Sequence, residues 1–171
     1  MSFAHAGAHQ NQDEAVCLAE VAQDAIGLLA LNRRNFEVQF FNLCDPDHWV
    51  DGDSQRLAQV LINLLSNARD ASPPHSAVRV KSEAFEHTVD LIVEDEGSGI
   101  PQNIMDRLFE PFFTTKDPGE GTGLGLALVY SIVEEHYGQI TIDSPADTES
   151  QRGTRIQVTL PRHVEATSAV N

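Results

Sequence analysis

Three groups of residues carry chemistry that a packed core does not need. Asn63 and Asn67 lie four positions apart in a segment with helical periodicity, so their side chains share one face. Asp95 opens the string Asp-Glu-Gly-Ser-Gly-Ile directly after an apolar run. Residues 119–126 read Gly-Glu-Gly-Thr-Gly-Leu-Gly-Leu. Amide oxygens can bind a metal, a carboxylate beside glycines can meet a flat ligand closely, and bare backbone N–H groups at a helix start suit phosphates.

The asparagines belong to a polar stripe that borders an apolar one. At about 100° per residue, four residues share the apolar face, namely Leu57, Leu61, Leu64 and Ala68. The polar stripe beside it holds Arg56, Gln59, Asn63, Asn67 and Asp70. An amide oxygen is a hard, neutral ligand suited to Mg²⁺ that also contacts substrate phosphates. The alternative is a solvated helix face. The neighbouring Arg69 could reach a phosphate or lie at the surface.

Asp95 is a candidate for recognising adenine. The apolar run before it predicts a strand that delivers the carboxylate to its end, where it can accept a hydrogen bond from the exocyclic amine. Guanine presents a carbonyl oxygen at that place, which would leave two acceptors facing each other. The alternative is an ordinary Asp-Gly turn. Only the spacing D-x-G-x-G selects Asp95 over Glu94 and Glu96.

The glycine run is not a Walker A loop, because no Gly-Lys-Ser/Thr ending follows. Its glycines offer freedom of movement and N–H groups near the positive end of a helix. Upstream, Lys116 is one of only two lysines, and its cationic side chain could meet an anionic phosphate group. A solvent-facing lysine is the alternative. Phe109 belongs to an aromatic cluster that either meets a ligand or anchors the loop in the core.

In this order the three groups resemble the N, G1 and G2 boxes of the catalytic ATP-binding domain of two-component sensor histidine kinases. This superfamily includes DNA gyrase B, MutL and heat-shock ATPase chaperones. Residues 108–116 resemble the F box of the segment that closes over ATP, and Gly153-Thr154 resembles a late glycine box. The resemblance covers roughly residues 13–162 and implies a Bergerat-type ATP-binding fold.

The resemblance also implies ATP and Mg²⁺ as ligands. Asn67 would be the metal ligand, with Asn63 and Lys116 as the other catalytic residues. The implied nucleotide-binding set is Asn63, Asn67, Asp70, Asp95, Gly97, Gly99, Ile100, Phe109, Lys116, Gly121, Thr122, Gly123, Leu124, Gly125 and Thr154.

One departure bears on the reaction. The gyrase, MutL and chaperone branch carries a glutamate base where this chain has Asn63, which accepts no proton at neutral pH. We therefore expect phosphoryl transfer to another acceptor instead of dedicated hydrolysis.

None of the seven histidines has the expected acceptor context, and His136 reads as a partner for a helix C-terminus. The implied partner is the dimerisation hairpin of a parent kinase and, indirectly, a response regulator. Alternatives are a serine kinase of the anti-sigma type and an interaction module that binds nucleotide without transfer.

Composition limits the remaining classes. The formal net charge is -15, which makes nucleic acid and anionic membrane poor partners. No apolar run approaches the roughly 20 residues that span a bilayer. We expect a cytoplasmic module whose parent could be anchored in the inner membrane. Cys17 and Cys44 are expected as buried free thiols.

The elements that must position these residues form an α+β pattern, a two-layer α/β sandwich whose mixed sheet is covered on one face by helices. Residues 1–12 are expected as a disordered lead or linker remnant, 13–162 as the catalytic ATP-binding domain, and 163–171 as a flexible tail. Helices are expected at 13–31, from the N-cap Asp53 to Ala71, in a short piece within 96–118, and at 123–137 before a C′ glycine, Gly138. Strands are expected at 36–40, 49–50, 78–85, 88–94, 139–142 and 153–160.

Overall fold

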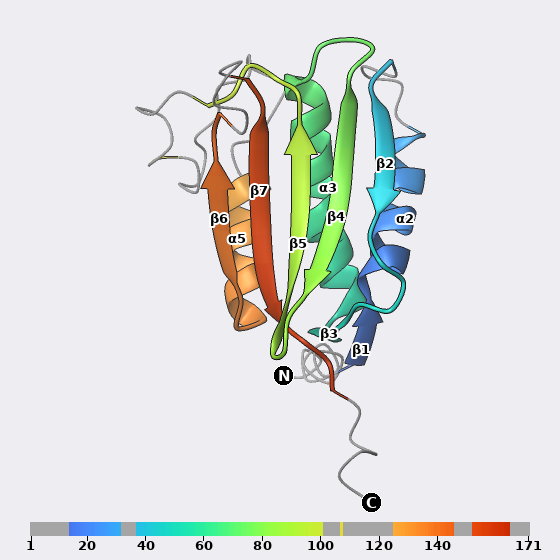
Figure 1. Cartoon of the computed structure of the whole chain (residues 1–171), viewed down its shortest axis with the longest axis vertical. Helices are drawn as coiled ribbons and strands as arrows, with labels where there is room; N and C mark the ends of the chain where they lie inside the picture. The colour runs from blue at the N-terminus through green and yellow to red at the C-terminus, as the bar shows by residue number, and fades with distance from the viewer. Residues whose placement is uncertain (1–13, 32–36, 101–106, 108–124, 146–151, 165–171) are drawn as a thin grey trace, which may run out of the picture.

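The computed structural model describes residues 14–31, 37–100, 107, 125–145 and 152–164. In this part of the chain, α2 (Leu18–Leu29), α3 (Ser54–Ala71) and α5 (Gly125–Glu135) lie against one face of a sheet (Figure 1). The sheet has the order β2-β4-β5-β7-β6. Its strands are β2 (Gln39–Leu43), β4 (Ala77–Ala84), β5 (Thr88–Asp95), β7 (Thr154–Pro161) and β6 (Gln139–Asp143). The β2–β4 pair is parallel and the other pairs are antiparallel, which confirms the expected mixed sheet.

Strand alternation decides which side chains face the helices. In β5, Val89, Leu91 and Val93 belong to the core cluster. They pack with the apolar stripe of α3, where Leu57, Leu61 and Leu64 are also buried. Truncating one such leucine to alanine typically costs about 2–5 kcal/mol, so this layer fixes α3 firmly on the sheet.

The bounds of α3 follow from local signals. The Asp53 carboxylate accepts hydrogen bonds from the backbone N–H groups of Gln55 (3.0 Å) and Arg56 (3.4 Å), which confirms the predicted N-cap. The helix ends at Ala71, and Ser72 at the C-cap has extended backbone before two prolines. An N-cap such as Asp53 contributes about 1 kcal/mol to stability.

The predicted first helix begins too early. Residues Glu14–Cys17 form the strand β1, and α2 starts at Leu18. β1 pairs antiparallel with β3 (Trp49–Gly52), a partner that is distant in sequence. Helical periodicity in one segment carries no signal of that pairing. The expected strand 36–40 is also shifted, because the parallel register with β4 runs from Gln39 to Leu43.

The C-terminus of α5 departs from the prediction. Tyr137, and not Gly138, has the left-handed backbone, with φ of 61°. The Gly138 N–H donates to the Val133 carbonyl (2.9 Å) and the Tyr137 N–H to that of Glu134 (3.0 Å), as in a Schellman motif with Tyr137 at C′. Gly138 is needed for a different reason: a Cβ there would lie 2.4 Å from the Thr159 carbonyl oxygen.

β3 is paired along both of its edges. β1 lies on one side, and on the other Val50 forms a bridge with Arg162. The His163 N–H also donates to the Trp49 carbonyl (3.0 Å). Figure 1 shows the β1–β3 pair at the end of the molecule away from the carboxyl end of β5.

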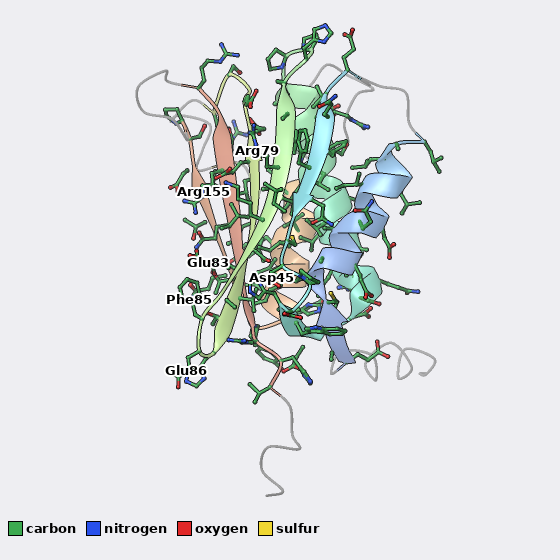
Figure 2. The ribbon with its side chains drawn as sticks, turned by 45° about the vertical axis from the view of Figure 1, so that its right-hand side comes forward. Asp45, Arg79, Glu83, Phe85, Glu86 and Arg155 are labelled. Carbon is green, nitrogen blue, oxygen red and sulfur yellow. The ribbon has the colours of Figure 1, made fainter. Side chains whose placement is uncertain are left out.

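The outer face of the sheet carries ion pairs. Glu94 pairs with Lys81 (2.8 Å) and with Arg155 (3.5 Å), and Arg155 also approaches Asp143 (3.7 Å). Figure 2 shows Glu83 and Arg155 on the side of the sheet that faces away from α2. Exposed pairs of this kind contribute about 0–1 kcal/mol each, so they keep the face solvated more than they stabilise it.

Two smaller expectations can be compared with the structure. Cys17 and Cys44 are free thiols, Cys17 buried and Cys44 half-buried. Burial raises the pKa of Cys44 to about 11. None of the helices within the described residues is long and apolar enough to cross a membrane.

Candidate functional site

Asp95 is the last residue of β5 and lies opposite Thr154 at the start of β7. Its Oδ1 accepts a hydrogen bond from the Gly97 N–H at 2.8 Å. Burial raises the pKa of Asp95, and the backbone N–H groups of Gly97 and Thr154 oppose that rise by stabilising the carboxylate. The nearby Glu96 adds a small further rise. The Asp95 carboxylate is therefore a half-buried hydrogen-bond acceptor that is held in a fixed orientation.

The three consecutive acids of this segment point in different directions. Glu94 pairs on the outer face with Lys81 and Arg155, and Glu96 pairs with Arg79 (3.1 Å). Alternation along β5 puts Asp95 on the same side as Val93, which faces the helices. Of these acids, Asp95 is the one presented to the helix layer.

The loop after Asp95 packs directly on the end of α3. A Cβ at Gly97 would lie 2.5 Å from the carbonyl oxygen of Ala71, the last residue of α3, so this contact admits only glycine. Gly99 has φ of 86°, in the left-handed region that favours glycine. Gly97, two residues after Asp95, therefore lies against α3 about one helical turn from Asn67.

A serine that the sequence did not mark completes the loop. The Ser144 Oγ accepts a hydrogen bond from the Ile100 N–H (2.6 Å) and lies 3.1 Å from the Thr154 Oγ1. The Gly153 N–H donates to the Gly97 carbonyl (2.7 Å), so the start of β7 and the loop are tied together. Ser144 stands in a Ser-Pro pair, which resembles any turn, and no motif could have identified it.

The asparagine stripe faces the first described residues of α5. The Asn63 Nδ2 donates to the Gly125 carbonyl at 3.2 Å, and the Asn63 Oδ1 accepts from the Gln59 Nε2 at 2.8 Å. A Cβ at Gly125 would lie 3.8 Å from the Asn67 Nδ2 and 3.9 Å from the Asn63 Nδ2. The predicted stripe thus meets the end of the glycine run.

The two charged residues after Asn67 have different surroundings. Arg69 is buried, and its Nη1 donates to the Leu29 carbonyl at the C-terminus of α2 (3.2 Å). A surface position for Arg69 is therefore wrong: its guanidinium closes the end of another helix. The largely buried Asp70 carboxylate lies 4.0 Å from the Arg69 Nε. Asp70 keeps its predicted place on the stripe.

Several predicted site residues lie outside the described residues: Phe109, Lys116, Gly121, Thr122, Gly123 and Leu124. The short helix expected within 96–118 also lies largely outside them. In the described ranges, no cluster of three His, Cys, Asp or Glu residues could hold a metal ion. The prediction of Mg²⁺ therefore rests on the amide of Asn67.

Comparison with known proteins decides the family. Residues 52–164 match the family described as histidine kinase-, DNA gyrase B-, and HSP90-like ATPase. The chain belongs to this family.

Its relatives narrow the assignment. Sporulation kinase A of Bacillus subtilis is 40% identical over 114 residues, which cover 67% of this chain and 18% of that protein. Sensor kinase CckA of Brucella abortus is 37% identical over 169 residues, covering 89% of this chain and 17% of its own length. Sensor histidine kinase ZraS of Escherichia coli is 35% identical over 152 residues, covering 88% of this chain and 31% of its own. The chain thus spans less than a third of each of these relatives.

Solved structures of sensor histidine kinases have the same fold as this chain. The mycobacterial sensor histidine kinase MprB superposes with a TM-score of 0.77 at 32% identity, covering 90% of this chain and 99% of the other. The catalytic domain of histidine kinase ThkA gives 0.76 at 29% identity, covering 88% and 96%. This chain is an ATP-binding catalytic domain of the sensor histidine kinase type, which confirms the predicted fold and domain function.

Proposed function

We propose that this domain holds Mg²⁺–ATP between α3 and the loop after β5, and passes the γ-phosphoryl group to a histidine on a separate dimerisation hairpin of a longer parent chain. One observation carries the proposal. The contact of Gly97 with Ala71 joins the Asp95 loop to the same helix that presents Asn63 and Asn67. An adenine acceptor and polar groups for a phosphate end therefore lie along one side of α3.

At the adenine end, the Asp95 carboxylate would accept the exocyclic amine. The N–H groups of Gly97 and Thr154 orient the carboxylate and favour its ionised form, which opposes the rise in pKa that burial causes. A preorganised acceptor selects adenine over guanine because the guanine oxygen would leave the carboxylate facing another acceptor.

At the phosphate end, the donor chemistry fits Mg²⁺. Asn67 offers a neutral amide oxygen, and Asp70 follows at i+3 on the same stripe. Bound Mg²⁺ would neutralise charge on the β- and γ-phosphates. The remaining contacts are assigned to Lys116 and to Gly121–Gly125, near the positive end of α5.

The absence of a carboxylate base at position 63 indicates which group receives the phosphoryl group. Asn63 cannot take a proton from water, so this domain would position ATP and leave the attack to a partner histidine. ThkA, 27% identical with a TM-score of 0.71, has been solved in complex with the response regulator TrrA. We propose a response regulator as the indirect partner of this domain's parent. Because the cytoplasm supplies ATP, we place the domain there, whether or not its parent has an anchor in the inner membrane.

Incubation with radiolabelled ATP, with and without the parent's dimerisation hairpin, tests the transfer. We expect acid-labile, alkali-stable label on the hairpin and none on the domain. Asp95→Asn is the negative control. Acid-stable phosphoserine on a partner would show a serine kinase instead, and ATP binding without any transfer would show an interaction module.

A further inference from the structure

α3 and α5 are joined by polar contacts at both ends of their packing. At one end the Asn63 Nδ2 donates to the Gly125 carbonyl (3.2 Å). At the other end the Asp53 N–H donates to the Nε2 of His136 (3.1 Å), the residue directly after α5. The two helices therefore run in opposite directions, and both are visible behind the sheet in Figure 1.

The hydrogen bonds of His136 define its tautomer. A backbone N–H can only donate, so Nε2 must present its lone pair to Asp53. Nδ1 then carries the proton and donates to the Ile132 carbonyl (2.9 Å). The residue is 5% exposed. His136 therefore bonds a carbonyl in the last turn of its own helix, as the sequence suggested, and it also bridges α5 to the residue that caps α3.

The ring also fits closely against the strand that leads into α3. A Cβ at Gly52 would lie 2.5 Å from the His136 Cδ2 and 2.8 Å from the Nε2. Beside it, Arg56 of α3 and Glu135 of α5 form an exposed ion pair. One buried hydrogen bond, one close backbone contact and one surface pair thus hold this end of α5.

We infer that His136 is a positioning residue for the phosphate end of the nucleotide site. The inference rests on the proposed function. An 11-residue helix is about 16 Å long and moves largely as a rod, so loosening one end of α5 displaces the other. That other end is Gly125, against which Asn63 and Asn67 are packed. Asp95 is carried by β5, outside this linkage, so adenine recognition does not depend on it.

Two substitutions separate the hydrogen bonds of His136. His136→Gln can place an amide oxygen near the Nε2 position and keep the bond from the Asp53 N–H. His136→Asn is shorter, and its amide can keep only the local bond to the Ile132 carbonyl. Val78→Ala is the control: this fully buried residue lies on β4, and its truncation lowers stability without touching α5.

The measurement is the affinity for a non-hydrolysable ATP analogue with Mg²⁺ and, separately, for adenosine. The measurements are made at a temperature where every variant is folded. We expect His136→Asn to weaken binding of the analogue about five- to tenfold, which is the scale of one buried hydrogen bond. Its adenosine affinity should stay native. His136→Gln should restore most of the loss, and Val78→Ala should leave both affinities unchanged. Equal losses for analogue and adenosine, or native affinity in both histidine variants, would overturn the inference.

Failure of the proposed nucleotide site would look different, because the native chain itself would then bind neither the ATP analogue nor adenosine. In that event, NMR signals of the backbone amides still test whether His136 positions the other end of α5. His136→Asn should shift the signals of Leu126 and Ala127, in the first described turn of α5, more than Val78→Ala does. Unshifted signals there would show that the two ends of α5 are not coupled.

Discussion

The Asp95 carboxylate has two opposing requirements. In the proposed site it must be ionised to accept the adenine amine, yet it is half-buried, and burial raises its pKa. The N–H groups of Gly97 and Thr154 offset part of that rise. A neutral asparagine would fit the same space without the penalty, so under the proposed function the carboxylate serves recognition at the expense of stability.

This tension gives a pH dependence of stability. Because the folded pKa of Asp95 is raised, the native chain is favoured relative to Asp95→Asn while the group is protonated. That advantage is lost as pH rises through the folded pKa. The free energy of unfolding of the native chain, minus that of Asp95→Asn, should therefore fall as pH rises above about 4. Urea denaturation of both proteins between acid and neutral pH measures this difference, and a constant or rising difference would contradict it.

The same substitution should remove base selectivity. We expect Asp95→Asn to weaken ATP binding at least about tenfold, as for the loss of a hydrogen bond to a charged group. GTP, excluded by the carboxylate, should lose little or gain. Glu94→Gln is the matched control, because the adjacent Glu94 lies on the outer face in its ion pairs. Calorimetric titration with ATP and GTP measures these affinities. Equal effects of the two substitutions would refute the role of Asp95 in recognising adenine.

Asn67 should carry the metal-dependent part of binding. Asn67→Ala is expected to abolish the gain in affinity for the ATP analogue that Mg²⁺ gives the native chain, and to leave adenosine binding intact. The control is Asn42→Ala, which removes a half-buried asparagine bonded to the Ala19 carbonyl far from the stripe. A native response to Mg²⁺ in Asn67→Ala would assign the metal elsewhere.

Among the elements, those with local signals were predictable. α3 has an N-cap aspartate and a terminating Ser-Pro-Pro, so its bounds could be predicted from the sequence. β1 was missed because a distant strand, β3, decides its conformation. For the same reason the sequence could select Asn63, Asn67 and Asp95 by motif but could not show the contribution of Ser144, which depends on where β6 ends beside β7.

Two glycines in and after helices should respond oppositely to alanine. Gly27 lies inside α2 with nothing within 4 Å of an added Cβ, so Gly27→Ala should stabilise the fold by about 0.5–1 kcal/mol. At Gly138 the added Cβ would meet the Thr159 carbonyl oxygen, so Gly138→Ala should destabilise it by about 1–3 kcal/mol. Chemical denaturation of both variants tests the pair, and changes of the same sign would contradict these contacts.

At the scale of the whole molecule, the net charge of -15 opposes the approach of an anionic nucleotide. Screening should reduce that repulsion, so the association rate of the ATP analogue should rise between low salt and about 0.15 M, where the Debye length shortens to about 8 Å. Uncharged adenosine is the control and should associate at a constant rate. Stopped-flow measurements test this, and a rate that falls with salt would show that local cations dominate the field.

The pairing on both edges of β3 also has a mechanical consequence. β1 and the Arg162–His163 segment are each antiparallel to β3, so they run in the same direction as one another. Tension that pulls these two segments apart therefore acts along the strand axis and loads their hydrogen bonds in shear, where the bonds must yield together instead of unzipping one by one. The load passes through β3 and bypasses the carboxyl end of β5. A pull applied at these two segments thus leaves the strand end that carries Asp95 unloaded.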